Sequence, residues 1–272
     1  MKASVLAMTA LLSSAAIADD YLIPPAIYAP QSTDSAFHEM PRPVNPNELI
    51  TIDVLMLYTP GVAISQLVKM MTDANNAYRD SGVNIHLRAI HIQEVAYTNH
   101  SNNSDTLRAL TNETDPAFRG VYQLRNDAKA DLVVLVRPFT YPIQDGCGAA
   151  WLLGMNEQAH LIHKQANYAY SVVSVGTSGG YVCSDLAFVH ELGHNMGLEH
   201  DKANATHKGA FPYAYGYKTD SFGTVMAYSA NRIARFSSPL QYCVGNELCG
   251  SEDTDNVRAL NEIRATIANF RN

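Results

Sequence analysis

The sequence predicts an α/β (α+β) domain built around a twisted mixed sheet, and two patterns carry that prediction. From residue 49 onward, apolar segments alternate in the order strand–helix–strand–helix–strand, which is typical of parallel strands joined by right-handed crossovers. The third strand, residues 131–136, is almost entirely apolar, as expected for a central strand covered on both faces. A closing C-terminal helix is indicated by apolar residues at helical spacing: Val257, Leu260, Ile263, Ile267 and Phe270.

The first half of the chain divides into elements by its periodicity. Residues 50–58 form a strand-like run, and Thr59-Pro60 after it has the sequence of a helix N-cap followed by proline at the first helical position. Apolar residues then recur at helical spacing over 64–78 and alternate as a half-buried strand over 83–89. The alternation changes phase at Ile90, which predicts a β-bulge.

The middle of the chain is less regular. Residues 98–116 are polar and rich in Asn, Ser and Thr, so we predict a loop there. A helix is expected over 117–128, and short strands are expected over 148–153 and 170–175.

Composition and charge exclude several classes of partner. The chain is 47% apolar and 17% charged, which is ordinary for a globular protein. Its formal net charge is −7 and its lysines and arginines form no cluster, which argues against a nucleic acid or a membrane surface as partner.

The N-terminal region predicts export. Residues 1–18 have the pattern of a secretory signal, with Lys2, a short apolar core and an A-x-A cleavage site ending at Ala18. We therefore expect a secreted mature protein, extracellular or periplasmic, after cleavage near Ala18. Residues 19–48 are a Pro-rich arm or a short propeptide, and residues 49–272 are expected to form one domain.

Four cysteines in an exported chain are expected to form disulfides. They allow three pairings, and the spacing alone does not choose among them. We favour Cys147–Cys183, which would tie the chain ahead of residue 190 to an earlier loop, and Cys243–Cys249, which would close a short loop. The competing interpretation is that Cys183 is a metal ligand or a reactive thiol.

The segment 190–201, HELGHNMGLEHD, forms the predicted site. His190 and His194 are four residues apart and lie on one helical face, so both can bind one metal ion while Glu191 stays outside the ligand set. On an unbroken helix His200 would face away. It can join the same metal only if the helix ends, and Gly197 is where such a turn costs least. Three neutral imidazoles with one open position are typical of catalytic zinc.

This arrangement matches every fixed position of H-E-x-x-H-x-x-G-x-x-H and therefore resembles the metzincin zinc endopeptidases. Residues 223–229, GTVMAYS, resemble the methionine turn of that family. Asp201 after the third histidine is similar to the reprolysin (adamalysin)-like branch, whereas Tyr228, two residues after Met226, is similar to the astacin and serralysin branches. The resemblance implies a metzincin-like catalytic domain with a long active-site helix, a methionine turn and an antiparallel edge strand.

The resemblance also implies roles for these residues. His190, His194 and His200 would hold one catalytic zinc ion, and Glu191 would act as general base and acid in peptide-bond hydrolysis. Met226 would form a hydrophobic floor beneath the imidazoles.

The remaining roles are expectations of the same kind. Asp201 would brace the methionine turn by hydrogen bonding. Tyr228 would either stabilise the oxyanion or simply pack. The chain after it, through Arg232, would form a wall of the S1′ pocket. An edge strand that pairs with substrate, or that is merely a plain edge, is expected over Gly148, Ala149, Ala150 and Trp151.

Two other functions fit the same residues. One is a zinc hydrolase of a non-protein substrate, and the other is a catalytically silent secreted module that binds zinc. Glu191 argues against the second, because a structural site needs no base. A protein or peptide substrate and a monomeric chain are expected, and the sequence leaves calcium binding open.

Other polar residues are weaker candidates. His160 and His163 could bind a second metal ion but fit surface positions better. Asp34 or His38 of the arm could reach the zinc, although a plain linker is the simpler interpretation.

Overall fold

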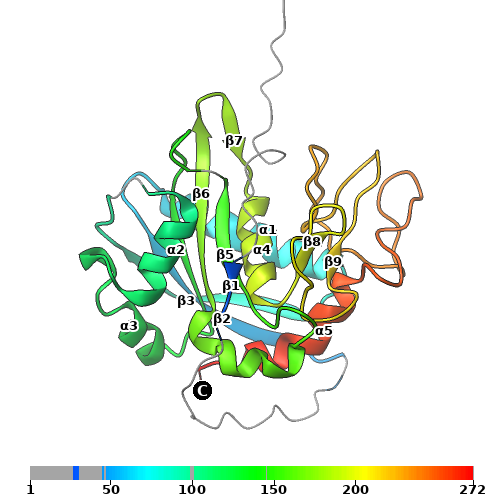
Figure 1. Ribbon diagram of the computed structural model, residues 1–272, viewed down its shortest axis with the longest axis horizontal. Helices are drawn as coiled ribbons and strands as arrows, with labels where there is room; N and C mark the ends of the chain where they lie inside the picture. The colour runs from blue at the N-terminus through cyan, green and yellow to red at the C-terminus, as the bar shows by residue number, and fades with distance from the viewer. Residues whose placement is uncertain (1–26, 31–44, 46, 99–100, 145, 272) are drawn as a thin grey trace, which may run out of the picture.

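A computed structural model describes residues 27–30, 45, 47–98, 101–144 and 146–271 (Figure 1). The expected signal segment and its cleavage site, together with Asp34 and His38, lie outside the described residues. None of the helices in the described part of the chain is long and apolar enough to cross a membrane.

A mixed sheet forms the centre of the structure, which confirms the predicted fold class (Figure 1). Its strand order is β1-β5-β6-β4-β2-β3, with β7 paired to β6. The strands are β1 (Ile27–Tyr28), β2 (Ile50–Tyr58), β3 (Ile85–Glu94), β4 (Leu132–Pro138), β5 (Gly148–Leu152), β6 (Tyr170–Ser178) and β7 (Tyr181–Cys183).

Four of these strands run parallel, and β5 runs antiparallel to them. β2 pairs in parallel with β3 and β4, and β4 pairs in parallel with β6, whereas β5 pairs antiparallel with β6. Val54 pairs with Ala89 and Leu55 with His91, so Ile90 is the extra residue of a bulge. This confirms the bulge predicted from the change in apolar phase.

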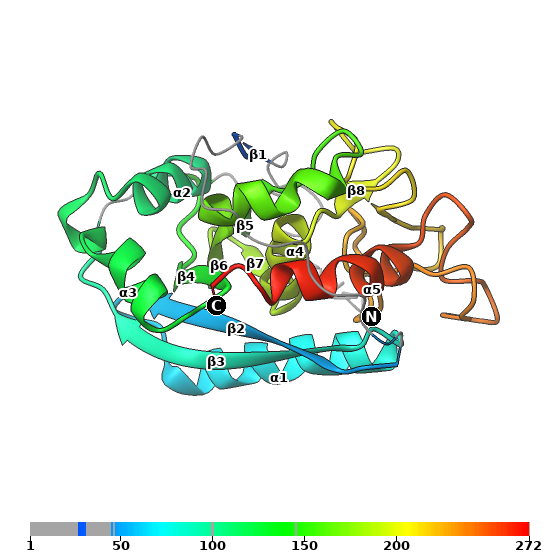
Figure 2. The same cartoon turned by 90° about the horizontal axis from the view of Figure 1, so that it is seen from below.

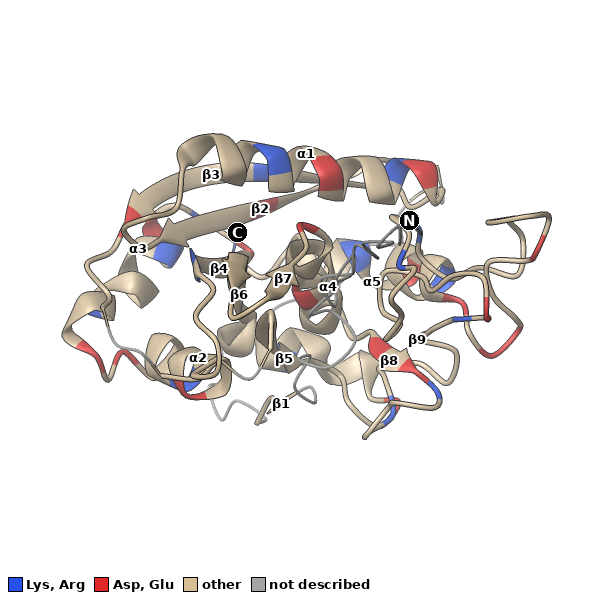
Figure 3. Ribbon diagram, turned by 90° about the horizontal axis from the view of Figure 1, so that it is seen from above, with Lys and Arg blue, Asp and Glu red and all other residues tan. Residues whose placement is uncertain are grey.

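The helices are α1 (Ile64–Asp80), α2 (Asn103–Asn112), α3 (Val121–Asp127), α4 (Leu186–Asn195) and α5 (Asn256–Ile267), with 3₁₀ helices η2 (Pro116–Phe118) and η3 (Ala159–Tyr168). Helix α1 lies along β3, as Figure 2 shows from below. The chain after α4 is mostly loops, with the short pair β8 (Glu199–Asp201) and β9 (Tyr215–Gly216), and it gathers on one side of the molecule (Figures 1 and 2). Acidic and basic positions are interspersed along the described ribbon (Figure 3).

The prediction of a loop over 98–116 is wrong, because α2 forms within it. The Asn102 side chain accepts a hydrogen bond from the Asp105 amide (2.7 Å), which caps the helix, and Leu107 and Leu110 are buried beneath it. The helix predicted over 117–128 is also interrupted. It divides into η2 and α3 because Gly120, at φ +86°, turns the chain between them.

One predicted helix start is also wrong. The Thr59 amide donates to the Val136 carbonyl (3.0 Å), so this residue still belongs to the pairing of β2 with β4, and α1 begins only at Ile64. Helix α4 begins at Leu186, directly after Asp185 at its N-cap. The Ser184 hydroxyl accepts from the Leu186 amide at 3.3 Å.

The N-terminal arm contributes one strand to the sheet. β1 pairs in parallel with the outer edge of β5, with Ile27 opposite Trp151. Ala29 is buried, and its carbonyl accepts from Gln165 Nε2 at 2.8 Å. The described part of the arm therefore contains one short strand, although the prolines of the arm favour irregular structure.

Both disulfides of the structure join the pairs that the sequence favours. Cys147–Cys183 links the start of β5 to the end of β7, with Cα atoms 5.3 Å apart, and Cys243–Cys249 closes the short loop. Cys183 is therefore neither a free thiol nor a metal ligand. The first bridge holds β5 against the chain that leads directly into α4.

Candidate metal centre

The site is built on α4, which is anchored to the sheet by one buried amide. Asn195 Nδ2 donates to the carbonyl oxygens of Trp151 in β5 and Tyr170 in β6, both at 3.0 Å. Because these bonds fix the C-terminal end of α4, they also fix the face of the helix that carries His190 and His194.

The helix ends where the sequence requires it to end. Gly197 has φ +85°, its amide donates to the His194 carbonyl (2.9 Å), and the Leu198 amide donates to the Gly193 carbonyl (3.0 Å). This pair of bonds is the Schellman arrangement, in which glycine takes the left-handed position at little cost. The turn reverses the chain into β8 and brings His200 back toward the helix.

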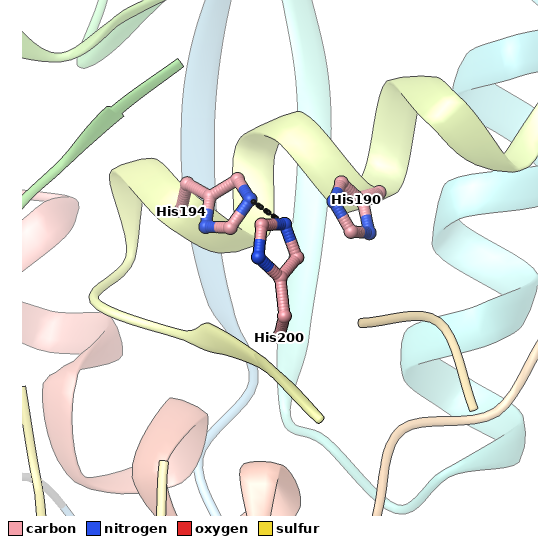
Figure 4. A group of neighbouring side chains, drawn as sticks. All are labelled: His190, His194 and His200. Atoms are coloured by element: carbon pink, nitrogen blue, oxygen red, sulfur yellow. Dashed lines mark hydrogen bonds between the residues drawn. The ribbon is translucent and has the colours of Figure 1, made fainter. Parts of the chain in front are cut away.

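Three imidazoles from these two segments face one another (Figure 4). The candidate ligand atoms of His190, His194 and His200 all lie within 4.8 Å of one another, and all three side chains are buried. His194 Nε2 and His200 Nε2 are 3.1 Å apart. Nitrogens this close are suited to share one metal ion.

Main-chain oxygens set the orientation of the two helical imidazoles. His190 Nδ1 is 2.9 Å from the Val225 carbonyl, and His194 Nδ1 is 2.8 Å from the Leu198 carbonyl. A carbonyl only accepts, so each Nδ1 carries the proton and each Nε2 keeps its lone pair for a metal. His190 Nε2 is buried and has no hydrogen-bond partner among the described residues. Such an orphaned acceptor is costly unless a ligand satisfies it, so the residues fit a zinc ion.

Glu199 is a site residue that the sequence analysis missed. Its carboxylate is buried, and Oε1 lies 2.8 Å from His200 Nδ1. Burial acts to raise the pKa of Glu199, but the contacts with His200 outweigh it and lower that pKa. A carboxylate behind a metal-binding imidazole orients the ring and increases its basicity. The sequence signal that could have identified Glu199 is its position directly before His200, the third histidine.

Burial keeps the helical imidazoles neutral. It lowers the pKa of His194 to about 3 and that of His190 well below its usual value, and the neighbouring imidazoles act in the same direction. A histidine binds a metal through its neutral form, so both rings are ready to act as ligands at neutral pH.

The Glu191 carboxylate lies against Gly148 of β5. A Cβ atom placed on Gly148 would lie 2.4 Å from Glu191 Oε1, so the carboxylate occupies the space that a side chain at position 148 would need. Burial raises the pKa of Glu191 to about 8, and the positive charge of Arg232 opposes that increase. A carboxyl group with a pKa near the working pH is suited to general acid–base chemistry.

The segment 223–229 packs beneath the histidines. A Cβ on Gly193 would lie 2.5 Å from Met226 Sδ, so the buried Met226 side chain rests against α4 between its two histidines. Asp201 Oδ2 accepts from the Tyr228 amide (3.0 Å), which ties this turn to β8. The Tyr228 ring lies 4.4 Å from the His200 ring, measured between centroids.

The outer edge of β5 is paired with another strand at Trp151 but not at residues 148–150 of the described chain. Trp151 pairs with β1, and its indole Nε1 donates to Thr111 Oγ1 of α2 (2.8 Å), so its side chain is fixed within the fold. On the described chain, residues 148–150 pair with β6 on one side and with no strand on the other. His160 is exposed on η3, and His163 is half-buried there.

Comparisons with known proteins agree with this geometry. Residues 59–254 match the profile described as metallo-peptidase family M12B, reprolysin-like. The chain is 30% identical over 252 residues to a peptidyl-Asp metalloendopeptidase of Pseudomonas aeruginosa, covering 81% of this chain and 40% of that protein. It is 27% identical over 238 residues to a protein of the same name from Stenotrophomonas maltophilia, covering 81% of this chain and 53% of that protein. The chain thus spans about half the length of these curated relatives, or less.

One solved structure shares the fold. A chain described in a "Structure of a chaperone-substrate complex" superposes with a TM-score of 0.64 at 20% identity, covering 83% of this chain and 35% of that chain. The histidine triad, the turn beneath it and the match over residues 59–254 lead to one conclusion. The chain belongs to the reprolysin-like M12B family of metallopeptidases.

Proposed function

We propose that this chain is a secreted zinc endopeptidase whose catalytic domain spans residues 49–272. The observation that carries the proposal is the buried triad itself, with the lone pair of His190 Nε2 left without a partner on the described chain and Glu191 beside it. Both curated relatives named above are peptidyl-Asp metalloendopeptidases, which supports peptide bonds as the substrate class. The signal-like residues 1–18 and the two disulfides support export.

The chain's own residues supply the binding and the proton transfers. His190, His194 and His200 would hold zinc, which supplies the Lewis acidity that polarises a carbonyl and activates a water molecule. The Glu191 carboxylate takes the proton from the attacking water and later delivers it to the leaving amine nitrogen. Met226 and Asp201 hold the triad from below through the contacts described above.

We further propose that substrate pairs antiparallel with residues 148–150 of β5. In this arrangement the peptide continues the sheet through main-chain hydrogen bonds and passes in front of Glu191, which faces Gly148. The pairing of β1 with Trp151 limits the strand that is open to substrate to these residues.

Tyr228 is proposed to stabilise the oxyanion. Burial, with the nearby carboxylates, raises the pKa of Tyr228, so its hydroxyl stays protonated and able to donate. Tyr228→Phe is expected to lower kcat about 100-fold while zinc stays bound, since one oxyanion donor is worth about that much. An unchanged kcat in steady-state assays would leave this tyrosine only a packing role.

The rival functions are a silent zinc-binding module and a zinc hydrolase of another substrate. A structural site leaves no open position and has no use for a buried carboxylate facing the open edge of a strand. To test the proposal, the purified protein is incubated with denatured casein, with and without o-phenanthroline. We expect cleavage that the chelator abolishes and that added zinc restores. Stoichiometric zinc without cleavage of any protein would favour the rivals.

A further inference from the structure

Helix α2 is bonded to β5 at both ends of that strand. Asn103, the first residue of α2, is fully buried, and its Nδ2 atom donates to the Gly146 carbonyl (2.6 Å), just before β5 begins. In the last turn of α2, Thr111 Oγ1 accepts from the indole Nε1 of Trp151 (2.8 Å), near the other end of β5. One helix, which packs beside β5 and β6, therefore holds the strand that is proposed to pair with substrate (Figures 1 and 2).

The Asn103 amide also connects the start of β5 to two other strands. Its Oδ1 atom accepts from Arg137 Nη2 of β4 (2.6 Å) and from Ser174 Oγ of β6 (3.0 Å). Because the amide oxygen is committed to these donors, the amide nitrogen is directed toward the Gly146 carbonyl. The chain that enters β5 is thus fixed by a side chain of α2 in addition to its pairing with β6.

At its other end, β5 is held between α2 and α4 through Trp151. The Trp151 carbonyl accepts from Asn195 Nδ2 of α4 (3.0 Å), whereas its indole donates to Thr111 of α2. Successive side chains of a strand point to opposite faces, so Trp151 and Gly148 lie on opposite faces of β5. The Glu191 carboxylate lies against Gly148. A shift of α2 would therefore move β5 relative to the carboxylate on its other face.

We propose that α2 is a brace that sets the position of the open edge of β5 relative to Glu191, and that Asn103 and Thr111 are positioning residues for the reaction. The inference rests on the proposed peptidase function and assigns a role to a helix outside the zinc site. Hydrogen bonds weaken steeply when their geometry is disturbed, and a displacement of about 1 Å at a reaction centre can cost about 100-fold in rate. A brace at both ends of the strand controls both quantities.

Two conservative substitutions each remove one end of the brace. Asn103→Asp retains the oxygen that accepts hydrogen bonds but loses the N–H that donates to the Gly146 carbonyl. Thr111→Val keeps the shape of the side chain but removes the hydroxyl that accepts from the Trp151 indole. Neither residue belongs to the zinc site, so both variants are expected to bind one zinc ion per chain.

Thr106→Val is the matched control, because it removes the same hydroxyl from the same helix. The hydroxyls of Thr106 and Thr111 each donate to the carbonyl four residues earlier, at 2.8 Å in both cases. The second contact of Thr106 Oγ1 is with the Tyr97 hydroxyl (3.2 Å) rather than with β5. An effect seen in Thr111→Val but not in Thr106→Val therefore belongs to the contact with β5.

The test compares peptides that differ in one main-chain N–H. An ester replaces a single amide at each of the three positions before the scissile bond in turn. In the zinc-loaded wild type, kcat/KM is expected to be about 3- to 10-fold higher for the amide than for the ester at the position that pairs with β5, the effect of one hydrogen bond. Asn103→Asp and Thr111→Val should lower kcat about 10-fold and bring this ratio toward 1. A loss of folded protein would reduce cleavage of both peptides equally and leave the ratio unchanged.

Trp151 is the only tryptophan of the chain, so its fluorescence reports on the brace without an assay of activity. Quenching by acrylamide should increase in Thr111→Val, because the indole is no longer held, and should stay at the wild-type level in Thr106→Val. Unchanged quenching in Thr111→Val would contradict the brace.

Three kinetic outcomes are decisive. Wild-type amide/ester ratios in both brace variants, or an equal loss in Thr106→Val, would overturn the inference. A ratio near 1 at every position in the wild type would also overturn it, because substrate would then not pair with β5, although cleavage of casein would still support the peptidase. A wild type that cleaves neither the peptides nor casein would instead refute the proposed function, and the inference with it.

Discussion

The position of the Glu191 carboxylate depends on a single residue of β5, Gly148. Gly148 has an ordinary strand conformation, and the space next to its Cα is filled by the Glu191 carboxylate. Alanine would suit the backbone at this position but would place a methyl group 2.4 Å from Glu191 Oε1. We therefore propose that Gly148 is a positioning residue, because it would act on the reaction only through Glu191.

Gly148→Ala is expected to lower kcat about 100-fold while one zinc ion per chain is retained, since displacement of a catalytic group by about 1 Å has an effect of that size. Steady-state kinetics with parallel metal analysis would measure both quantities. The same substitution made in Glu191→Ala, where the clash is absent, should reduce the melting temperature less than it does in the wild type. Wild-type kcat in Gly148→Ala would contradict this role.

At the same scale, the residues that could be predicted are those whose geometry is local. The spacing of His190, His194 and Gly197 determines their placement through helix geometry, so the sequence alone brought them together. Glu199 and Gly148 could not be found in this way. Glu199 acts through its contact with the His200 ring. Gly148 acts through its contact with Glu191, which lies in a helix 43 residues later in the chain.

At the scale of elements, the sequence predicted best where the apolar residues follow a clear pattern. β2 and β4 are apolar runs, and α1 and α5 show apolar residues at helical spacing. The bulge at Ile90 could be located because a one-residue slip moves every later side chain to the other face. α2 was missed because only Leu107 and Leu110 mark its buried face, and the surrounding Asn and Thr residues are more typical of loops.

Elements formed by distant contacts could not be predicted at all. The pairing of β1 with β5 joins residues more than a hundred positions apart and involves only two residues of the arm. Similarly, α1 begins after Thr59 because that residue is bound to Val136 of β4, which no local pattern reveals. The local sequence pattern therefore predicts the type of an element, whereas contacts with distant residues determine the residue at which the element begins.

For the whole molecule, the sheet brings three separate segments to one site. β5 supplies Gly148 beside the open edge, α4 and β8 supply the histidines, and the turn around Met226 closes the site from below. Asn195 and the Cys147–Cys183 bridge attach α4 to β5 at its two ends. The arrangement holds the three imidazoles together and leaves the unpaired edge of β5 beside them.

The central claim is that the triad binds zinc and that Glu191 performs the proton transfers. Its most direct test is casein cleavage by wild type and Glu191→Ala, with the zinc content of both proteins measured in the same samples. We expect one zinc ion per chain in each, and a loss of cleavage of about 10²- to 10⁴-fold in the variant, because general acid–base catalysis contributes that much. Equal cleavage by a zinc-loaded Glu191→Ala variant, or cleavage by wild type without zinc, would contradict the account.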